Sequence, residues 1–401
     1  MKFRKSCILI APLRVWCSIK LPVFYEEGFL RTELLLGGGA IHLVVDTGSV
    51  SFHVVGQNFF PHWCQHYPHN CYELSPDELK ALKKRKGKTR GYVEVEEKMR
   101  PMEGQVEVVG MPKPASIGMR LYVVVRAKQR TKTGSWESDQ AMPEASLGLG
   151  PPREKSDTFL AQLVEHGVIS HPVFTLKLPA GDPGRGELTL GRLESKEASE
   201  AGNLVYLPIG VDASNKLKWA VMLSSMSVWG RDKIDIENLV VVDSGAGYLS
   251  GPPEEAGKLI SAFFKRADEA AKRVVLKATT GYHYLRCDDA KYLPDLELKF
   301  STGSIASNVL FIRGEMLVQK TSRGEGELGC EFLITERVGS MWTLGRSLFR
   351  NRTVRFDAHE GKIGLVLEAS SQEERARIRF SRLRMLFPGS KHKRLRSSFM
   401  V

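Results

Sequence analysis

A short pattern that occurs twice, at an offset of 197 residues, constrains this chain more than any other feature. The apolar run 42–45 leads into Asp46-Thr47-Gly48-Ser49, and the apolar run 238–242 leads into Asp243-Ser244-Gly245-Ala246. Each copy predicts a buried β-strand that enters a tight turn. A single copy would suit an aspartate that only ends a strand, but two matched copies predict a duplicated lobe.

A Leu-Gly pair repeats at the same offset and strengthens this prediction. The pairs lie in Ser146-Leu147-Gly148-Leu149 and Thr343-Leu344-Gly345-Arg346, and in each half the glycine is 102 residues beyond the aspartate. Between these landmarks most segments have the pattern of short strands broken by Gly and Pro, such as 186–191 and 294–300. The predicted fold class is therefore mainly β.

Two helices are predicted from apolar stripes. Ser156 or Asp157 can cap the first, which runs to about Glu165 or His166. Pro252-Pro253 precedes the second. The stripes that face the core are Phe159, Leu160 and Leu163 in the first helix and Leu259, Ile260, Phe263 and Phe264 in the second.

Chain length and composition indicate the class of protein and the number of lobes. A chain of 401 residues with 42% hydrophobic and 26% charged residues indicates a soluble protein of two lobes. It contains no run of 18 uncharged apolar residues, so no transmembrane span is expected. We expect an N-terminal segment 1–28 with a degenerate signal-like start, lobes at 29–196 and 204–367, and a basic tail at 368–401.

Positive charge is concentrated in two places, within a net charge of +12. One is the tail, and the other is the run Lys83-Lys84-Arg85-Lys86-Gly87-Lys88-Thr89-Arg90. Such runs can bind nucleic acid or anionic membranes, but more often they are solvated loops or tails. No nucleic-acid motif accompanies them, so no specific nucleic-acid partner is expected.

Over roughly Phe29 to Leu367 the chain resembles the pepsin-like aspartic proteases, peptidase family A1. The resemblance rests on a set of segments, which are the two aspartate motifs, 146–150, 160–174, 186–191, 250–252, 293–296, 342–345 and 354–365. It implies a two-lobed acid protease barrel fold with a cleft between the lobes, and an aspartic endopeptidase that needs no metal or other cofactor. Peptide or protein substrates and a monomeric state are the expectations for partners.

The resemblance makes Asp46 and Asp243 the catalytic pair. Two carboxyl groups about 3 Å apart cannot both ionise, so one keeps a proton while the other activates water. By resemblance Asp243 is more often drawn as the base, although the sequence alone does not assign the roles. The residues expected to support the pair are Thr47, Gly48, Ser49, Ser244 and Gly245.

Two departures from the family pattern, the flap motif and position 53, leave room for an alternative, and a third difference, at position 246, predicts activity at less acidic pH. The flap motif Tyr-Gly-[Thr/Ser]-Gly is absent, and Tyr92, the candidate flap tyrosine, could equally be an ordinary strand residue. His53 stands where the family usually has Trp, and Ala246 cannot donate a hydroxyl hydrogen bond to Asp243. The alternative is a weak or inactive relative that binds peptides or proteins in the cleft.

The resemblance pairs Cys64 with Cys71 and Cys287 with Cys330 as disulfides. Disulfides imply an oxidising compartment, so the secretory pathway, a vacuole or lysosome, or the exterior is expected. The segment 62–71 also holds enough His and Cys for zinc, although its spacing fits no standard zinc finger, and no metal site is predicted.

Overall fold

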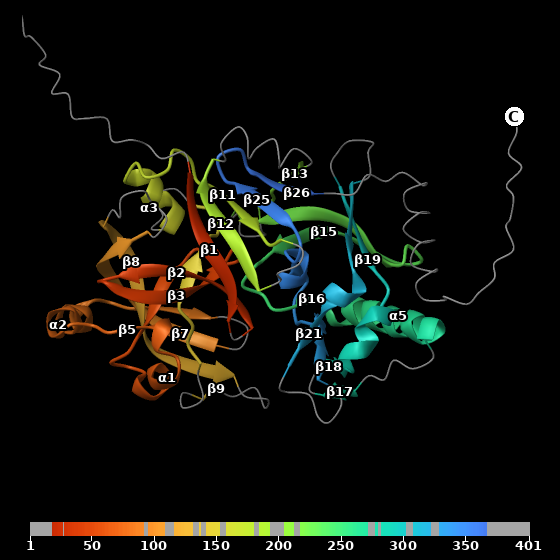
Figure 1. Ribbon diagram of the computed structural model, residues 1–401, viewed down its shortest axis with the longest axis horizontal. Coiled ribbons are helices and arrows are strands. Elements are labelled where there is room, and N and C mark those ends of the chain that lie inside the picture. The colour runs from red at the N-terminus through yellow and green to blue at the C-terminus, as the bar shows by residue number, and fades with distance from the viewer. Residues whose placement is uncertain are drawn as a thin grey trace, which may run out of the picture.

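The computed structural model describes residues 18–26, 28–91, 95–108, 116–130, 136–137, 142–152, 158–179, 184–192, 204–211, 217–271, 277–279, 282–301, 308–321 and 329–366. The N-terminal segment up to residue 17, the expected lobe boundary near 194–203, Tyr92 and the basic tail lie outside these ranges. The described part is built mostly of strands with a few short helices, as predicted. In Figure 1 the N-terminal half (red to yellow) and the C-terminal half (green to blue) lie side by side.

The largest sheet contains strands of both halves. Its order is β13-β26-β25-β11-β12-β1-β2-β3-β10-β4-β8-β7-β6, with β5 and β9 paired at its sides. Its strands are β1 (Ser18–Glu26), β2 (Phe29–Leu36), β3 (Gly39–Asp46), β4 (Phe52–Gly56), β5 (Cys71–Tyr72), β6 (Lys88–Gly91), β7 (Val95–Glu107), β8 (Ser116–Arg130), β9 (Trp136–Glu137), β10 (Ser146–Gly148), β11 (Val173–Lys177), β12 (Arg185–Gly191), β13 (Leu204–Pro208), β25 (Thr353–Asp357) and β26 (Lys362–Val366).

The C-terminal half adds two smaller sheets. One has the order β20-β19-β14-β15-β24-β16-β23 and the other β17-β18-β22-β21. Their strands are β14 (Ala220–Val228), β15 (Asp232–Val242), β16 (Leu249–Gly251), β17 (Lys277–Thr279), β18 (Tyr282–Leu285), β19 (Leu296–Phe300), β20 (Asn308–Ile312), β21 (Val318–Lys320), β22 (Cys330–Phe332), β23 (Ile334–Glu336) and β24 (Trp342–Leu344).

The helices are α1 (Pro61–His66), α2 (Pro76–Lys84), α3 (Phe159–Glu165) and α5 (Pro253–Ala271), with 3-10 turns η1 (Pro68–Asn70), η2 (Cys287–Tyr292), η3 (Gly314–Leu317) and η4 (Arg346–Leu348). Both predicted helices are present, and their apolar stripes pack into the core. The predicted cap of α3 is wrong, because Thr158 is the N-cap and its hydroxyl accepts a hydrogen bond from the amide of Ala161. Thr158 lies one and two residues beyond the candidates, and Thr also caps helices well.

Aromatic packing joins the two halves. Phe174 on β11 stacks on Phe356 of β25, with ring centroids 4.6 Å apart, and Trp219 packs against Phe356 at 5.1 Å. The indole of Trp219 also donates to the carbonyl of Leu149 at 2.7 Å. Buried rings with a satisfied indole N–H stabilise such a junction strongly. This junction holds the loop after β10 against the C-terminal half.

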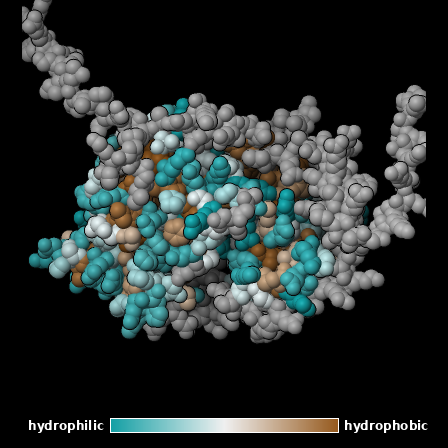
Figure 2. Space-filling view, in the orientation of Figure 1, coloured by the Kyte–Doolittle hydropathy of each residue, from teal (hydrophilic) through white to brown (hydrophobic). Residues whose placement is uncertain are grey.

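The basic run that begins in the last turn of α2 is largely solvated. Lys83, Lys84, Arg85 and Lys86 are exposed, and Figure 2 shows a largely hydrophilic surface in this part of the molecule. Arg90, the last residue of the run, is only partly exposed. Most side chains of the run therefore face solvent, whereas that of Arg90 is partly buried.

Candidate active site

Each aspartate lies where a strand ends beside a parallel neighbour. Asp46 closes β3, and β10 runs parallel to it with Gly148 opposite Asp46. Asp243 follows β15, and β24 runs parallel to that strand with Leu344 opposite Val242. The strand after each aspartate, β4 or β16, pairs antiparallel with the other side of the same neighbour. The repeat seen in the sequence is therefore a repeat of structure.

The glycine of each Leu-Gly pair makes this arrangement possible. A Cβ on Gly148 would lie 2.4 Å from the carbonyl oxygen of Ser51, and one on Gly345 would lie 2.2 Å from that of Tyr248. Real side chains do not approach a backbone so closely, so only glycine fits. This explains why the pair recurs at one distance from each aspartate.

Thr47 and Ser244 brace the two aspartate loops against each other. The Thr47 hydroxyl donates to the carbonyl of Val242 at 2.9 Å and accepts from the Ser244 amide at 2.9 Å. The Ser244 hydroxyl donates to the carbonyl of Val45 at 2.6 Å and accepts from the Thr47 amide at 3.2 Å. Both residues are buried, so these four bonds hold the loops at a defined separation.

The carboxyl groups of Asp46 and Asp243 lie close together beside the hydrogen bonds of Thr47 and Ser244. The carboxyl groups of Asp46 and Asp243 are close enough to change each other's protonation. The Gly48 amide donates to Oδ1 of Asp243 at 3.2 Å, and a Cβ on Gly48 would lie 2.3 Å from Oδ2 of Asp243. On the other side, a Cβ on Gly245 would lie 2.7 Å from Oδ1 of Asp46. Each glycine therefore leaves room for the carboxyl group of the opposite loop.

The surroundings of Asp46 and Asp243 differ, and they favour the protonated form of Asp46 and the ionised form of Asp243. Burial and, to a smaller extent, the charge of Asp243 raise the pKa of Asp46 to about 8, against the opposing effects of Arg90 and the Gly48 amide. Burial also raises the pKa of Asp243, but the amides of Gly245, Ala246 and Gly48 oppose this by donating to it. Donors that favour the charged form make Asp243 the better anion. Asp46 then keeps the shared proton.

Ser146 and Arg90 belong to this site, and the sequence reasoning missed both. The Ser146 hydroxyl lies 3.5 Å from Oδ2 of Asp46, whereas Ser49 Oγ accepts from the amide of Ser51. We expected Ser49 to contact Asp46, but the hydroxyl that contacts Asp46 is that of Ser146 on β10. Arg90 acts on Asp46 through its charge. The only sequence signal for Ser146 was its place in the repeated Leu-Gly segment.

The flap region is only partly described. Tyr92 lies outside the described residues, between β6 and β7, which pair Gly91 with Glu96. His53 is 1% exposed on β4, and its Nε2 lies 3.5 Å from Oε2 of Glu97 on β7. A polar pair thus connects these strands where the resemblance leads one to expect a Trp. Neither reading of Tyr92 is tested by this geometry.

Both predicted disulfides are present. Cys64 bonds to Cys71 and Cys287 bonds to Cys330. The first bond leaves no thiolate in segment 62–71 for zinc, and His66 Nδ1 is bonded to the carbonyl of His62. Across the described ranges, no group of three or more His, Cys, Asp or Glu side chains could hold a metal ion.

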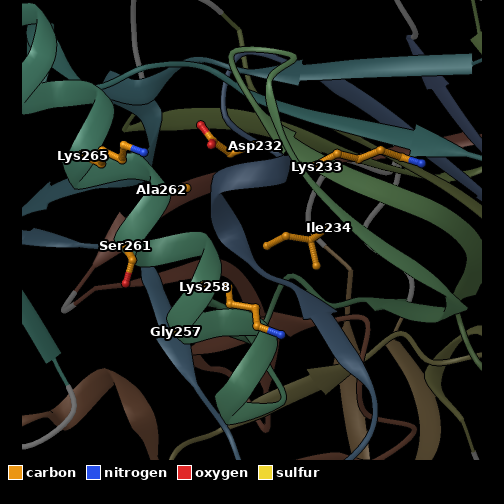
Figure 3. Close-up of a pocket in the computed structure, with 8 residues that line it drawn as sticks. All are labelled: Asp232, Lys233, Ile234, Gly257, Lys258, Ser261, Ala262 and Lys265. Atoms are coloured by element: carbon orange, nitrogen blue, oxygen red, sulfur yellow. The ribbon is translucent and has the colours of Figure 1, made fainter.

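A separate hollow lies between the start of β15 and α5, as Figure 3 shows. Its lining includes Lys233 and Lys258, whose ammonium groups pair with Asp235 at 2.5 Å and Glu254 at 2.6 Å. Neither catalytic candidate lines it. Because Lys233 and Lys258 are already paired and neither Asp46 nor Asp243 lines the hollow, we do not assign chemistry to it.

Comparison with known proteins agrees with the fold. The family model for eukaryotic aspartyl protease matches residues 123–367, a range that includes Asp243 and begins after Asp46. The chain therefore belongs to the eukaryotic aspartyl protease family. It is similar to renin of the dog, Canis lupus familiaris, with 25% identity over 235 residues, which are 55% of this chain and 52% of renin. The chain thus spans about half the length of that relative.

In the described part of the chain, no helix combines the length and apolar character that crossing a bilayer requires.

Proposed function

We propose that this protein is an active aspartic endopeptidase in which Asp46 and Asp243 activate one water molecule. The observation that carries the proposal is the close approach of two carboxyl groups held by the Thr47–Ser244 brace, one of which receives three backbone amides. Such a pair supplies a base and an acid at once. Membership of the protease family supports the same reaction.

The chemistry follows from the proton distribution. Ionised Asp243 takes a proton from water, and the water oxygen bonds to the scissile carbonyl carbon. Asp46 gives its proton to the carbonyl oxygen, which yields a neutral tetrahedral diol. When the C–N bond breaks, Asp243 passes its proton to the leaving nitrogen, and a diol hydroxyl returns a proton to Asp46 as the new carboxyl group forms. The pair ends in its starting state.

The two disulfides support an oxidising compartment for this activity, because disulfides persist in the secretory pathway, in lysosomes and outside the cell. Peptides or unfolded proteins are the proposed substrates. The alternative function, peptide binding without catalysis, is favoured by the unusual His53–Glu97 contact beside the expected flap.

The test is cleavage of denatured haemoglobin between about pH 3 and 7, with and without pepstatin. We expect pepstatin-sensitive cleavage that Asp243→Asn abolishes. Asp232→Asn is the matched control, because this carboxylate pairs with Arg266 at 2.7 Å in the C-terminal half and should leave cleavage intact. A folded wild-type protein that cleaves nothing across this range would favour the binding function.

A further inference from the structure

Arg346 is a buried cation next to the loop that carries Asp243. Its side chain belongs to a residue that is 7% exposed, and its amide donates to the carbonyl of Ala246 at 2.9 Å. Within the described part of the chain, its buried Nε has no hydrogen-bond partner. A buried guanidinium nitrogen without a hydrogen-bond partner is costly, so this geometry favours a ligand that supplies an acceptor.

The neighbouring charges do not satisfy Arg346. The nearby carboxylate of Glu331 accepts from the Tyr248 hydroxyl at 2.8 Å and from Nε2 of Gln319 at 3.2 Å. Arg350, a second cation close by, donates to the carbonyls of Met316 and Val318. Burial lowers the pKa of Arg346, but a guanidinium keeps its charge in proteins. Two arginines therefore lie near one carboxylate, Glu331, which is bonded to other residues.

A second polar atom without a partner belongs to the other lobe. The hydroxyl of Tyr25, on β1, is buried and has no hydrogen-bond partner among the described residues. Tyr25 is close enough to Arg346 to interact with it electrostatically. A phenol O–H and a guanidinium N–H are both donors, so the same ligand group could accept from both.

Two glycines and one aromatic ring border the guanidinium of Arg346. Gly28 is exposed, and a Cβ there would lie 3.8 Å from Nη1 of Arg346. Gly247 is partly exposed, and a Cβ there would lie 2.7 Å from Nη2. The ring of Phe29 lies 5.8 Å from Cζ of Arg346 and adds an apolar wall. Two glycines thus flank the terminal nitrogens where larger side chains would crowd them.

We propose that Arg346 and Tyr25 form a carboxylate-binding subsite that recognises an acidic side chain of the substrate close to the scissile bond. The proposal rests on the peptidase function proposed above. A guanidinium binds a carboxylate with two parallel hydrogen bonds, which a neutral amide cannot match. Gly247 is four residues beyond Asp243 in the same loop, which limits the subsite to residues near the bond that is cut.

The test compares cleavage sites in a peptide library, identified by mass spectrometry, for wild type, Arg346→Gln and Tyr25→Phe. We expect wild type to favour Asp or Glu at one position near the cut by about tenfold or more, and Arg346→Gln to lose this preference. Tyr25→Phe should weaken it. Cleavage by wild type without any acidic preference, or a preference that Arg346→Gln retains, would overturn the subsite while leaving the peptidase function standing.

Two further measurements distinguish a specific role of Arg346 from the general effect of removing an arginine, and binding from catalysis. Arg350→Gln removes a neighbouring arginine that donates to the carbonyls of Met316 and Val318, so it should lower stability and keep the acidic preference. If no cleavage occurs, melting of the Asp46→Asn, Asp243→Asn double variant is compared with acidic and amide-matched peptide mixtures. Greater stabilisation by the acidic mixture, lost with Arg346→Gln, would support the subsite without catalysis, and equal stabilisation would overturn it.

Discussion

Nε2 of His53 lies 3.5 Å from Oε2 of Glu97, and this contact links the strand after Asp46 to the strand next to the expected flap. Burial lowers the pKa of His53 to about 3 and raises that of Glu97 to about 8. Both side chains are therefore neutral between these values, and the contact is not an ion pair. Charged groups that act on it are Arg90, Lys88 and Glu144.

The first prediction concerns Glu97 and pH. Folded protein keeps the Glu97 proton up to about pH 8, whereas the unfolded chain loses it near 4.5. The folded state then binds more protons, so this group's contribution to stability falls as pH rises through that window. Glu97→Gln should gain stability relative to wild type, on the order of a few kcal/mol, between about pH 4.5 and 8. Urea unfolding at several pH values measures it.

Glu103→Gln provides the control for this prediction. Glu103 lies exposed on the same strand, β7, and its substitution should change stability little and without this pH dependence. A difference between Glu97→Gln and wild type that stays constant from acid to mildly alkaline pH would contradict the prediction.

The second prediction concerns the brace. Ser244→Ala removes a hydroxyl that bonds to Val45 and Thr47 and leaves a buried carbonyl and amide without that partner. Each unsatisfied group costs about 1 to 3 kcal/mol, and the aspartate loops should shift as well. We expect lower stability in urea and a lower kcat. Ser340→Ala, an exposed site, should show neither effect, and unchanged kcat in Ser244→Ala would speak against the brace.

The third prediction concerns Gly48. A Cβ there would lie 2.3 Å from Oδ2 of Asp243, so Gly48→Ala must displace the carboxyl group. A displacement of about 1 Å can reduce the rate about 100-fold, and we expect at least that loss in kcat. Gly91→Ala is the control, because its Cβ would meet nothing within 4 Å. Near-normal cleavage by Gly48→Ala would contradict the proposed geometry.

The fourth prediction concerns Ala246. Its amide donates to Oδ1 of Asp243 at 3.3 Å, and its side chain adds no donor. A hydroxyl at this position would stabilise the ionised form of Asp243 and lower the acidic pKa of the pair. Ala246→Thr should therefore shift the acidic limb of the kcat/KM profile to lower pH. An unchanged profile would mean that the new hydroxyl does not reach the carboxylate.

The fifth prediction compares the disulfides. The Cys287–Cys330 bond closes a loop with a separation of 43 residues, whereas Cys64–Cys71 spans 7. Chain entropy assigns about 4 kcal/mol to the longer loop and about 2.5 kcal/mol to the shorter one. Replacing Cys287 and Cys330 with Ala should destabilise the protein more than replacing Cys64 and Cys71. Urea unfolding of both double variants measures the two losses in the free energy of unfolding. A larger loss on removing the Cys64–Cys71 bond would contradict the prediction.

Much of the fold and the core of the site could be predicted from the sequence. The repeated aspartate and Leu-Gly motifs located both turns, because strand patterns and turn glycines are local signals that the chain displays directly. The family resemblance supplied both disulfide pairs. The cap of α3 was missed by one residue, since Thr, Asp and Ser compete closely for that position.

The sequence by itself determined that two similar strand–turn units would each present an aspartate, because hydrophobic periodicity and glycine placement act over a few residues. Only the tertiary structure decided which distant groups act on those acids. Ser146, Arg90 and the His53–Glu97 pair come together across strands that are not neighbours in the chain. The protonation of Asp46 depends on burial and on contacts between the halves, which no local pattern encodes. The same is true of Arg346 Nε, which has no hydrogen-bond partner among the described residues.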